Sequence, residues 1–330
     1  MENKLYVLFE YLRKLCAVDI ERILSFTLGI VTANDGQPER PVCPHCGGKH
    51  VIKYGHKDGK QRFFCHTCKQ TFMHTTNTLM ENSHYPRSIW ADFIKDTITG
   101  VSLDESAYKY GFSHQTAFNM RHKVLLALQD FMNYNPVMLS GVAEFDETFV
   151  LECNKGKKFA ANSKRKPRLH GAKASSRGIS NEMVAICVGI QRDGAAIAET
   201  VNRAKPSKEE LASIFADHIK DGTLLLTDGL RSYSTFEGFK NCSVMDATRT
   251  NGAFFNLNTV NGMHSFIKDL YNHYRGVATK YINRYNALFS LSYRCMEGLA
   301  STLFSNMCNI STYSFRHTVQ EVQSLNLVAL

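Results

Sequence analysis

The alternation of hydrophobic and polar positions divides the chain into successive regions with different expected structures. Residues 1–34 carry apolar side chains at helical spacing and predict two short helices. A polar, turn-rich linker follows at 33–41, and residues 42–75 are dense in cysteine, histidine, glycine and lysine. Residues 86–133 return to helical spacing, whereas strands mixed with helices are expected from Gly141 onward. The pattern therefore predicts a multi-domain protein.

The region after Gly141 has the pattern of an α/β domain. Its strand segments are alternating or continuously apolar, and its clearest helix begins with a capping box made by Ser207 and Glu210. The predicted elements are three strands, a helix and a further strand, at 141–150, 182–191, 194–201, 207–220 and 223–229. This order predicts a ribonuclease-H-like α/β core over 141–290, with a basic insertion at 154–178 and a C-terminal helical tail at 291–330.

Composition indicates a globular protein with a basic surface. Hydrophobic residues make up 44% of the 330 residues, which excludes an intrinsically disordered chain. Lysine and arginine number 39 against 30 acidic residues, and the formal net charge of +9 favours a polyanionic partner. The most apolar early stretch, residues 23–31, is too short to span a membrane, and no signal peptide is visible. We therefore expect a cytoplasmic protein without a membrane partner.

Two CxxC pairs mark the cysteine-rich region, CPHC at 43–46 and CHTC at 65–68. Two such pairs separated by 18 residues supply four thiolates for one tetrahedral Zn²⁺, with ligands Cys43, Cys46, Cys65 and Cys68. Four sulfur ligands leave no open position, so the zinc of this ribbon at 42–75 is expected to be structural. A redox CxxC and unrelated free thiols are the alternatives. The basic side chains around the ribbon either contact DNA or form a solvated face.

Residues 102–128 have the internal pattern of a helix-turn-helix within the helical region 86–133. Ser102 is placed to cap a first helix, Gly111 supplies the turn, and Ser113 is placed to cap a second helix. Side chains near the start of the second helix would reach base edges in a major groove. The polar and basic positions expected there are His114, Gln115, Asn119, Arg121, His122 and Lys123. The alternative is an ordinary helical hairpin in a small bundle.

Two aspartates lie in or at the end of predicted strands of the α/β region. Asp146 is in the middle of EFDETFV, and Asp228 closes LLLTD. A carboxylate in a central strand costs several kcal/mol unless it is paired or binds a metal, and hard Mg²⁺ or Mn²⁺ prefers such oxygen ligands. A turn at Asp228 and a structural salt bridge at Asp146 are the alternatives. Glu144 shares the strand face of Asp146 and is a weaker ligand candidate, whereas Glu147 points to the opposite face and supports the fold.

A third group of polar residues, Asn261, His264 and Lys268, has spacings of three and four and would share one helix face. Alone, this face is equally consistent with a solvated stripe. The surrounding segment 258–285, NTVNGMHSFIKDLYNHYRGVATKYINRY, resembles the end of the catalytic domain in insertion-sequence transposases of the ISXO2-like group, which carry an N-terminal zinc ribbon. DET at 146–148, TDG at 227–229 and RGVATKY at 275–281 also resemble this family, and the resemblance covers roughly residues 42–290.

The resemblance implies a role for each matching position. Asp146 and Asp228 would be carboxylate ligands of catalytic Mg²⁺ or Mn²⁺, Asn261 would stand at the third position, and Lys268 would contact the DNA end. His264 would contact DNA or pack, and Arg275 would contact DNA. The usual third residue is an acid, so Asn261 implies a more weakly held second metal. A domesticated, inactive copy is therefore an alternative.

A strongly basic loop is expected between the first two strands of the core. Nine lysines and arginines fall between residues 155 and 177, and Gly, Ser and Ala are frequent among them. Such a loop would become ordered on a phosphate backbone, through contacts that include Lys164, Arg165, Lys166 and Arg168. The alternative is a solvated loop that keeps the protein soluble.

Together these features predict a metal-dependent transposase of the Asp-Asp-Asn type. Its partners would be double-stranded DNA, as element ends and target, and further copies of the same chain through residues 1–34 or 284–310. Such a protein would associate with the nucleoid through DNA. A DNA-binding regulator with an inert core and a structural zinc protein in a larger complex are the alternatives.

Overall fold

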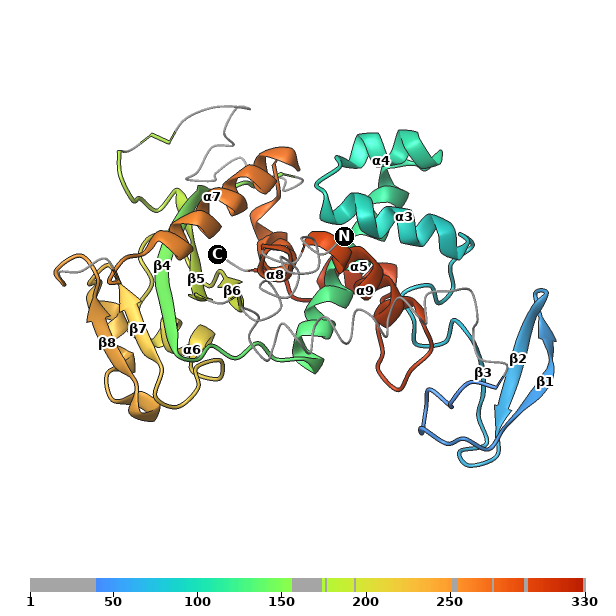
Figure 1. Ribbon diagram of the computed structural model, residues 1–330. Coiled ribbons are helices and arrows are strands. Elements are labelled where there is room, and N and C mark those ends of the chain that lie inside the picture. The colour runs from blue at the N-terminus through green and yellow to red at the C-terminus, as the bar shows by residue number, and fades with distance from the viewer. Residues whose placement is uncertain are drawn as a thin grey trace, which may run out of the picture. The chain divides into compact units, whose positions relative to one another are not determined.

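The structure is a computed structural model, and it describes residues 40–155, 174–175, 177–192, 194–250, 254–274, 276–293 and 296–328. It consists of two compact units, each made from two separate parts of the chain (Figure 1). The first unit takes Met1–Ile98 and Cys295–Thr318, and the second takes Thr99–Arg294 and Val319–Leu330. The helices expected in residues 1–34 and most of the basic insertion lie outside the described residues.

A three-stranded antiparallel sheet forms the cysteine-rich part of the first unit. Its strands, in spatial order, are β1 (Val51–Lys57), β2 (Lys60–Cys65) and β3 (Thr71–Met73). One face of the sheet is buried, where Val51, Phe63 and Phe72 pack beside Cys43 and Cys65. So few apolar side chains give the ribbon little hydrophobic stabilisation of its own.

The rest of the first unit joins chain segments that are far apart in sequence. Helix α3 (Arg87–Ile98) packs against helix α9 (Met296–Cys308). The guanidinium of Arg87 fixes this pairing, because it donates a 2.7 Å hydrogen bond to the carbonyl oxygen of Cys308 at the end of α9. The predicted tail at 291–330 therefore contributes one helix to the first unit and, further on, one helix to the second.

Two helices joined by a tight turn open the second unit, α4 (Leu103–Tyr110) and α5 (His114–Tyr134). The hydroxyls of Ser102 and Ser113 each accept a hydrogen bond from the backbone N–H three residues further on. Gly111 ends α4 with a φ of 67°, in the left-handed region that favours glycine. The caps and the turn are present as the sequence predicts. The boundary between the units falls before α4 and so divides the region 86–133.

Arg121 and His122, which the sequence places on the DNA-facing side of the second helix, are buried instead. Both side chains are 1% exposed. Position 121 lies four residues after Ala117 and four before Leu125, and both of those residues are fully buried. The side chain of Arg121 therefore joins the inner stripe of α5, where it donates to the carbonyl oxygen of Val101 at 2.6 Å. The expectation that Arg121 and His122 face DNA is corrected by this burial.

The core of the second unit is a five-stranded sheet with the order β6-β5-β4-β7-β8. Strands β4, β5 and β6 pair antiparallel, whereas β7 and β8 run parallel to β4 and to each other. The strand bounds are β4 (Val142–Leu151), β5 (Met183–Gln191), β6 (Ala196–Glu199), β7 (Leu224–Thr227) and β8 (Ser243–Asp246). The predicted chain order of three strands, a helix and a strand is present. The sheet is mixed, and β4 lies at its centre.

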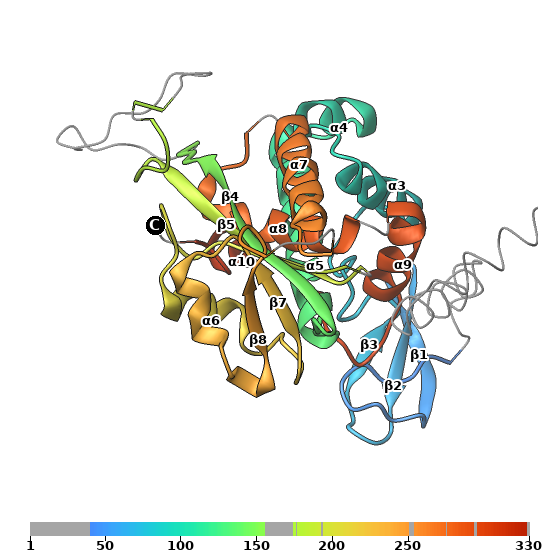
Figure 2. The same cartoon turned by 60° about the vertical axis from the view of Figure 1, so that its left-hand side comes forward.

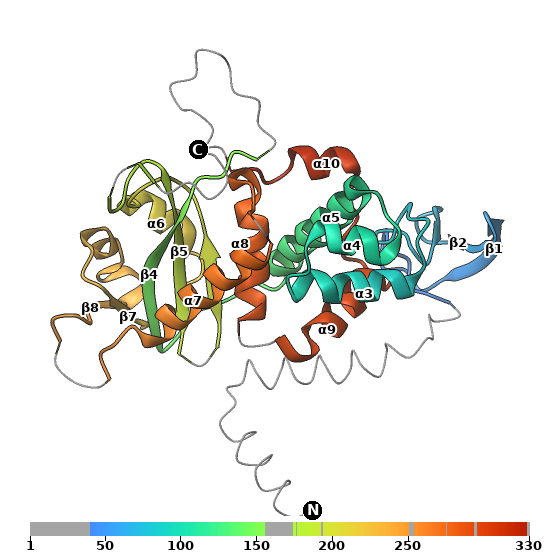
Figure 3. The same cartoon turned by 90° about the horizontal axis from the view of Figure 1, so that it is seen from above.

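Helices cover the two faces of this sheet differently (Figures 2 and 3). On one face, helix α6 and the 3-10 helix η1 pack on Phe145, with Phe215 and Tyr233 among the buried side chains. On the other face, α7 contacts β4 and β5, and α8 contacts β6. The remaining helices are α6 (Lys208–Phe215), η1 (Arg231–Phe236), η2 (Phe239–Asn241), α7 (Asn258–His273), η3 (Thr279–Tyr281), α8 (Ile282–Ser292) and α10 (Val319–Ser324). None of the described helices is long and apolar enough to cross a membrane.

The burial of Arg121 predicts that Arg121→Ala lowers the stability of the second unit. The substitution removes a donor from a buried carbonyl and leaves a cavity, so we expect the free energy of unfolding to fall by about 2–4 kcal/mol. Gln115→Ala, on the exposed side of the same helix, should change it by less than about 0.5 kcal/mol. Denaturant unfolding measures both variants. A stable Arg121→Ala protein with weakened DNA binding would show that the side chain faces DNA after all.

Candidate active site

The pairing of β4 with β7 brings the two predicted aspartates to one place on the sheet. Val142 pairs with Leu224 and Glu144 with Leu226, an offset of 82 positions (224 − 142 = 82). The same offset places Asp146 level with Asp228, which immediately follows β7. The Asp228 carboxylate also accepts a hydrogen bond from the backbone N–H of Leu230, so the turn expected as an alternative is present as well.

Asp146 has an environment that disfavours its ionised form. Its side chain is 21% exposed, and burial raises the pKa of its carboxyl to about 6. The negative charge of Asp228 raises this pKa further, while the backbone N–H of Glu147 and the ammonium of Lys268 lower it. Asp228 lies level with Asp146 on the neighbouring strand, and Lys268 follows His264 by one turn of α7, so both charges act on Asp146. A divalent cation bound there would relieve the repulsion between the two carboxylates.

Glu147 points to the opposite face of β4, as its place in the strand predicts. Its carboxylate accepts a 2.6 Å hydrogen bond from the hydroxyl of Tyr233, within the core that α6 and η1 cover. Burial raises the pKa of Glu147 to about 7, and the charges of Asp146 and Asp228 contribute to the increase. Glu147 therefore shares the electrostatic field of the aspartates while its hydrogen bond supports the fold.

Helix α7 presents the third group of predicted residues above the aspartates. His264 Nδ1 lies 3.9 Å from Asp146 Oδ2, and Asn261 and Lys268 are one turn before and one turn after it. Asn261 and Lys268 are exposed, whereas the His264 side chain is 8% exposed. Burial, aided by the charge of Lys268, lowers the pKa of His264 to about 4, so its ring is neutral at pH 7. Of the two alternatives for His264, packing rather than contact with DNA fits this burial.

Glu144 has a structural role that its sequence position alone does not reveal. Its side chain is fully buried, and one oxygen accepts hydrogen bonds from the backbone N–H groups of Thr259 (2.8 Å) and Val260 (3.0 Å). These groups belong to the first turn of α7, and no side chain at the N-cap position Leu257 satisfies them. Glu144 is thus the cap of α7, and its possible role as a weaker metal ligand is corrected by this geometry.

The second oxygen of Glu144 extends this connection to the chain before the helix. Arg192 Nε donates to it at 2.7 Å, and Arg192 Nη2 donates to the carbonyl oxygens of Phe254 (2.6 Å) and Asn256 (3.0 Å). The guanidinium also lies over the Phe254 ring, with 4.6 Å between Cζ and the ring centroid. Because Glu144 precedes Asp146 by two residues on the same strand face, one network fixes α7 relative to Asp146.

The predicted DNA-binding residues of α5 are distributed over different environments. His114 and Gln115 are exposed at the start of the helix, and His114 Nε2 lies 3.5 Å from Asp104 Oδ1. Gln115 donates a 2.9 Å hydrogen bond to Asn119, and both Asn119 and Lys123 are half-buried. The predicted loop contacts Lys164, Arg165, Lys166 and Arg168, together with Arg275, lie outside the described residues.

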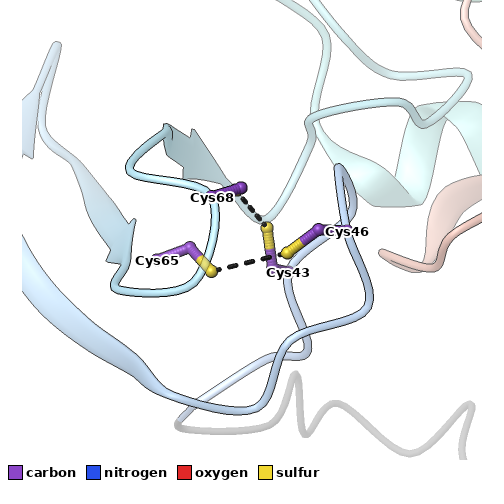
Figure 4. A group of neighbouring side chains, drawn as sticks. All are labelled: Cys43, Cys46, Cys65 and Cys68. Carbon is purple, nitrogen blue, oxygen red and sulfur yellow. Dashed lines mark hydrogen bonds between the residues drawn. The ribbon is translucent and has the colours of Figure 1, made fainter.

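The four cysteines of the ribbon form a cluster in the first unit (Figure 4). Their sulfur atoms all lie within 4.8 Å of one another, with Cys43 Sγ 3.6 Å from Cys68 Sγ and Cys46 Sγ 3.7 Å from Cys65 Sγ. Tetrahedral zinc with bonds of about 2.3 Å requires sulfur separations of about 3.8 Å. Hydrogen bonds from backbone N–H groups of the CxxC turn lower the pKa of Cys65 to about 6, which favours its thiolate, whereas burial raises the pKa of Cys43 to about 12. This cluster could bind zinc.

Comparison with known proteins finds a family match within the second unit, where residues 138–294 match the family described as ISXO2-like transposase domain. Residues 138–294 thus resemble an ISXO2-like transposase domain. Asp146, Asp228, Asn261 and Lys268 all lie within it, and the resemblance drawn from the sequence is confirmed.

A curated relative and a solved structure are also similar to this chain. The relative, from Halobacterium salinarum, is described as an uncharacterized protein in transposable element ISH50; it is 23% identical over 254 residues, which are 76% of this chain and 84% of that protein. The structure is a pre-cleavage Mos1 transpososome, with 12% identity over 62% of this chain and 72% of the other. Its TM-score is 0.24, a value at which the likeness carries no argument about the fold. The family match and the relative support a transposase role.

The raised pKa of Asp146 predicts that this residue destabilises the second unit at neutral pH. The folded protein binds the proton of the Asp146 carboxyl more tightly than the unfolded chain does. The stability that this protonation contributes is therefore lost as pH rises from about 4 through about 6. At pH 8, Asp146→Asn should therefore unfold at a higher temperature than wild type, and its free energy of unfolding should be greater by at most about 3 kcal/mol. Both differences should vanish near pH 4. Thermal unfolding without Mg²⁺ or Mn²⁺ measures this. Asp217→Asn, at an exposed position, is the control, and an equal gain at both pH values would contradict the assignment.

The capping network predicts that substitutions at position 144 destabilise the second unit to different extents. Glu144→Ala leaves two N–H groups of α7 and the Arg192 guanidinium without their acceptor, so we expect a loss of about 2–4 kcal/mol in unfolding free energy. Glu144→Gln retains a carbonyl acceptor for the helix and should lose less. Hydrogen exchange at Thr259 and Val260 should accelerate in the order wild type, Gln, Ala. Unchanged exchange in Glu144→Ala would show that α7 does not depend on this cap.

Proposed function

We propose that the second unit is the catalytic core of a DNA transposase, with a ribonuclease-H-like fold that cleaves and joins DNA strands in a metal-dependent reaction. One observation carries the proposal. Within the ISXO2-like transposase domain, the parallel pairing of β4 and β7 sets Asp146 level with Asp228, below the helix that carries Asn261 and Lys268. The sheet order β6-β5-β4-β7-β8 with a central, acid-bearing β4 supports the ribonuclease-H-like interpretation.

The side chains at this site fit a divalent cation. Asp146 and Asp228 offer carboxylate oxygens. Burial, with a smaller contribution from the charge of Asp228, raises the pKa of Asp146, and a bound cation would favour its ionised form. Asn261 would offer a carbonyl oxygen as a third donor from α7. When bound, Mg²⁺ or Mn²⁺ would activate the attacking hydroxyl and stabilise the leaving oxygen in an in-line phosphoryl transfer. The protein's part is to hold these donors at fixed positions on a strand, a strand end and a helix.

Lys268 would position the DNA. It is exposed, and its charge acts on both Asp146 and His264, which supports a position of the ammonium beside the site. There it would contact a phosphate at the element end. The neutral, buried ring of His264 keeps the helix close to the strand without adding a charge that would repel a cation.

Asn261 makes this site less acidic than one with three carboxylates. A unit charge 4 Å from another is worth about 4 kcal/mol at an effective dielectric near 20, so an amide should bind the cation less strongly than an acid. DNA phosphates would supply part of the missing charge. This amide is also the observation that favours the second candidate function, a domesticated derivative that binds DNA but no longer cleaves it.

The other regions would recognise and hold DNA. In this proposal the ribbon binds one structural zinc through Cys43, Cys46, Cys65 and Cys68, and the start of α5 reads element ends through His114 and Gln115. The basic loop would contact the phosphate backbone. Bringing two element ends together requires more than one copy of the chain, so we propose that it assembles as a homo-oligomer on DNA.

Strand cleavage and strand transfer with Mn²⁺ and DNA taken from both sides of the gene test the proposal. Asp146→Asn and Asp228→Asn should each reduce the rate by about 100-fold or more, whereas Asp217→Asn, an exposed aspartate elsewhere in the unit, should not. Asn261→Asp should bind Mn²⁺ more tightly than wild type, and Asn261→Ala less tightly, as measured by calorimetry. DNA binding without cleavage by any variant, Asn261→Asp included, would favour the inactive derivative.

A further inference from the structure

The zinc ribbon carries a connected strip of aromatic rings on the face of its sheet that does not form the core. Ile52 pairs with Phe64 across β1 and β2, and Tyr54, two residues after Ile52, contacts Phe64 at 5.5 Å between ring centroids. Phe64 contacts His66 at 5.2 Å, and His66 stacks on His50 at 4.4 Å with 20° between the ring planes. Four rings thus form one continuous strip.

Strand alternation explains why these rings are together and why they are accessible. Successive side chains in a strand point to opposite faces, so Val51, Phe63 and Cys65 enter the core while their neighbours Ile52 and Phe64 face outward. Tyr54 is 48% exposed, and Phe64 and His66 are half-buried. Rings on a solvent-facing sheet surface use part of their area for contacts across the strands, which stabilise the strand pairing. The exposed part of each ring is available to a partner.

The same strands carry a strong positive charge. Arg62 lies over the Tyr54 ring, with 5.0 Å between its Cζ and the ring centroid. Residues 42–75 contain one acidic residue, Asp58, against six basic residues: Lys49, Lys53, Lys57, Lys60, Arg62 and Lys69. Aromatic rings interleaved with cations are suited to a partner that combines planar π systems with negative charge. A hydrophobic protein partner would not require this charge.

We propose that the ring strip Tyr54–Phe64–His66–His50 binds unpaired nucleotides of DNA, with bases stacked on the rings and phosphates beside the lysines. Bases in a duplex offer only their edges, whereas unpaired bases offer their faces to a flat aromatic surface. The hairpin also leaves room for a strand, since Gly55 follows Tyr54 in a bulge with φ 67° and no atom lies within 4 Å of the position that a Cβ would occupy. This binding is separate from the catalytic aspartates and goes beyond the proposed function.

Fluorescence anisotropy of the full-length, zinc-loaded protein with a labelled oligothymidylate of 12 nucleotides tests the proposal. Tyr54→Ala should weaken binding by about 5- to 150-fold, the usual effect of losing one stacked base. Tyr54→Phe keeps the ring and should bind like wild type, whereas Tyr54→Leu keeps an apolar side chain without a ring and should lose affinity as Ala does. Tyr134→Ala, at a 41% exposed tyrosine in the second unit, is the matched control and should change nothing.

Three results would overturn the proposal. Wild-type affinity in Tyr54→Ala or Tyr54→Leu would show that the ring is not a stacking surface. An equal loss of affinity for a blunt duplex of 12 base pairs would show a general DNA contact instead of one for unpaired bases. A loss of self-association with unchanged oligonucleotide binding would assign the strip to a second copy of the chain.

Thermal unfolding and zinc content verify that each variant is folded, and Tyr54→Leu and Tyr54→Phe provide the comparison if Tyr54→Ala does not fold. The assay measures oligonucleotide affinity without strand cleavage, so failure of the catalytic proposal would leave this one intact.

Discussion

A buried carboxylate on the central strand holds the helix that completes the proposed active site. Glu144 accepts two backbone N–H groups from the first turn of α7 and pairs with Arg192, which in turn binds the carbonyl oxygens just before that helix. A helix N-terminus carries partial positive charge, so a buried carboxylate there is stabilised by the same groups that it satisfies. Together with the packing of α7 on β4 and β5, this connection sets the positions of Asn261 and Lys268 relative to Asp146.

The arrangement separates two tasks that acidic residues perform on one strand face. Glu144 is fully compensated and contributes to stability, whereas Asp146, two residues further on, is incompletely compensated and has a raised pKa. Incomplete compensation lowers stability, but it is the property that makes a carboxylate available to a metal ion. Proteins commonly retain such unfavourable groups at functional sites, and the stable network beside Asp146 offsets part of this effect.

How far the sequence predicts this structure depends on whether the relevant interaction is local. The caps Ser102, Ser113 and Ser207 and the turn at Gly111 were predictable because they involve neighbours within a few residues. Each CxxC pair is local in the same sense, and the two pairs, although 19 and 25 residues apart at their contacts, were predicted to meet because one zinc requires four ligands.

Interactions that depend on tertiary packing were harder to predict. Arg121 was placed on the surface by its charge, although its spacing from Ala117 and Leu125 was the available signal for burial. The helix N–H groups that Glu144 caps are main-chain groups more than a hundred residues away, and no side-chain pattern identifies them. Likewise, α9 returns to the first unit through contacts such as Arg87 with Cys308, which are 221 positions apart.

The two units are stabilised by different means. The second unit has a large apolar core on both faces of its sheet, whereas the ribbon sheet buries only a few apolar side chains around its cysteines.

Anomalous scattering from crystals of the protein soaked in Mn²⁺ would determine whether α7 and the two strands together make a metal site. We expect a manganese peak within about 2.0–2.6 Å of oxygens from Asp146 and Asp228, with the side-chain oxygen of Asn261 turned toward it. A manganese ion bound by the aspartates with Asn261 directed away from it, or no ion between them, would contradict the arrangement described here.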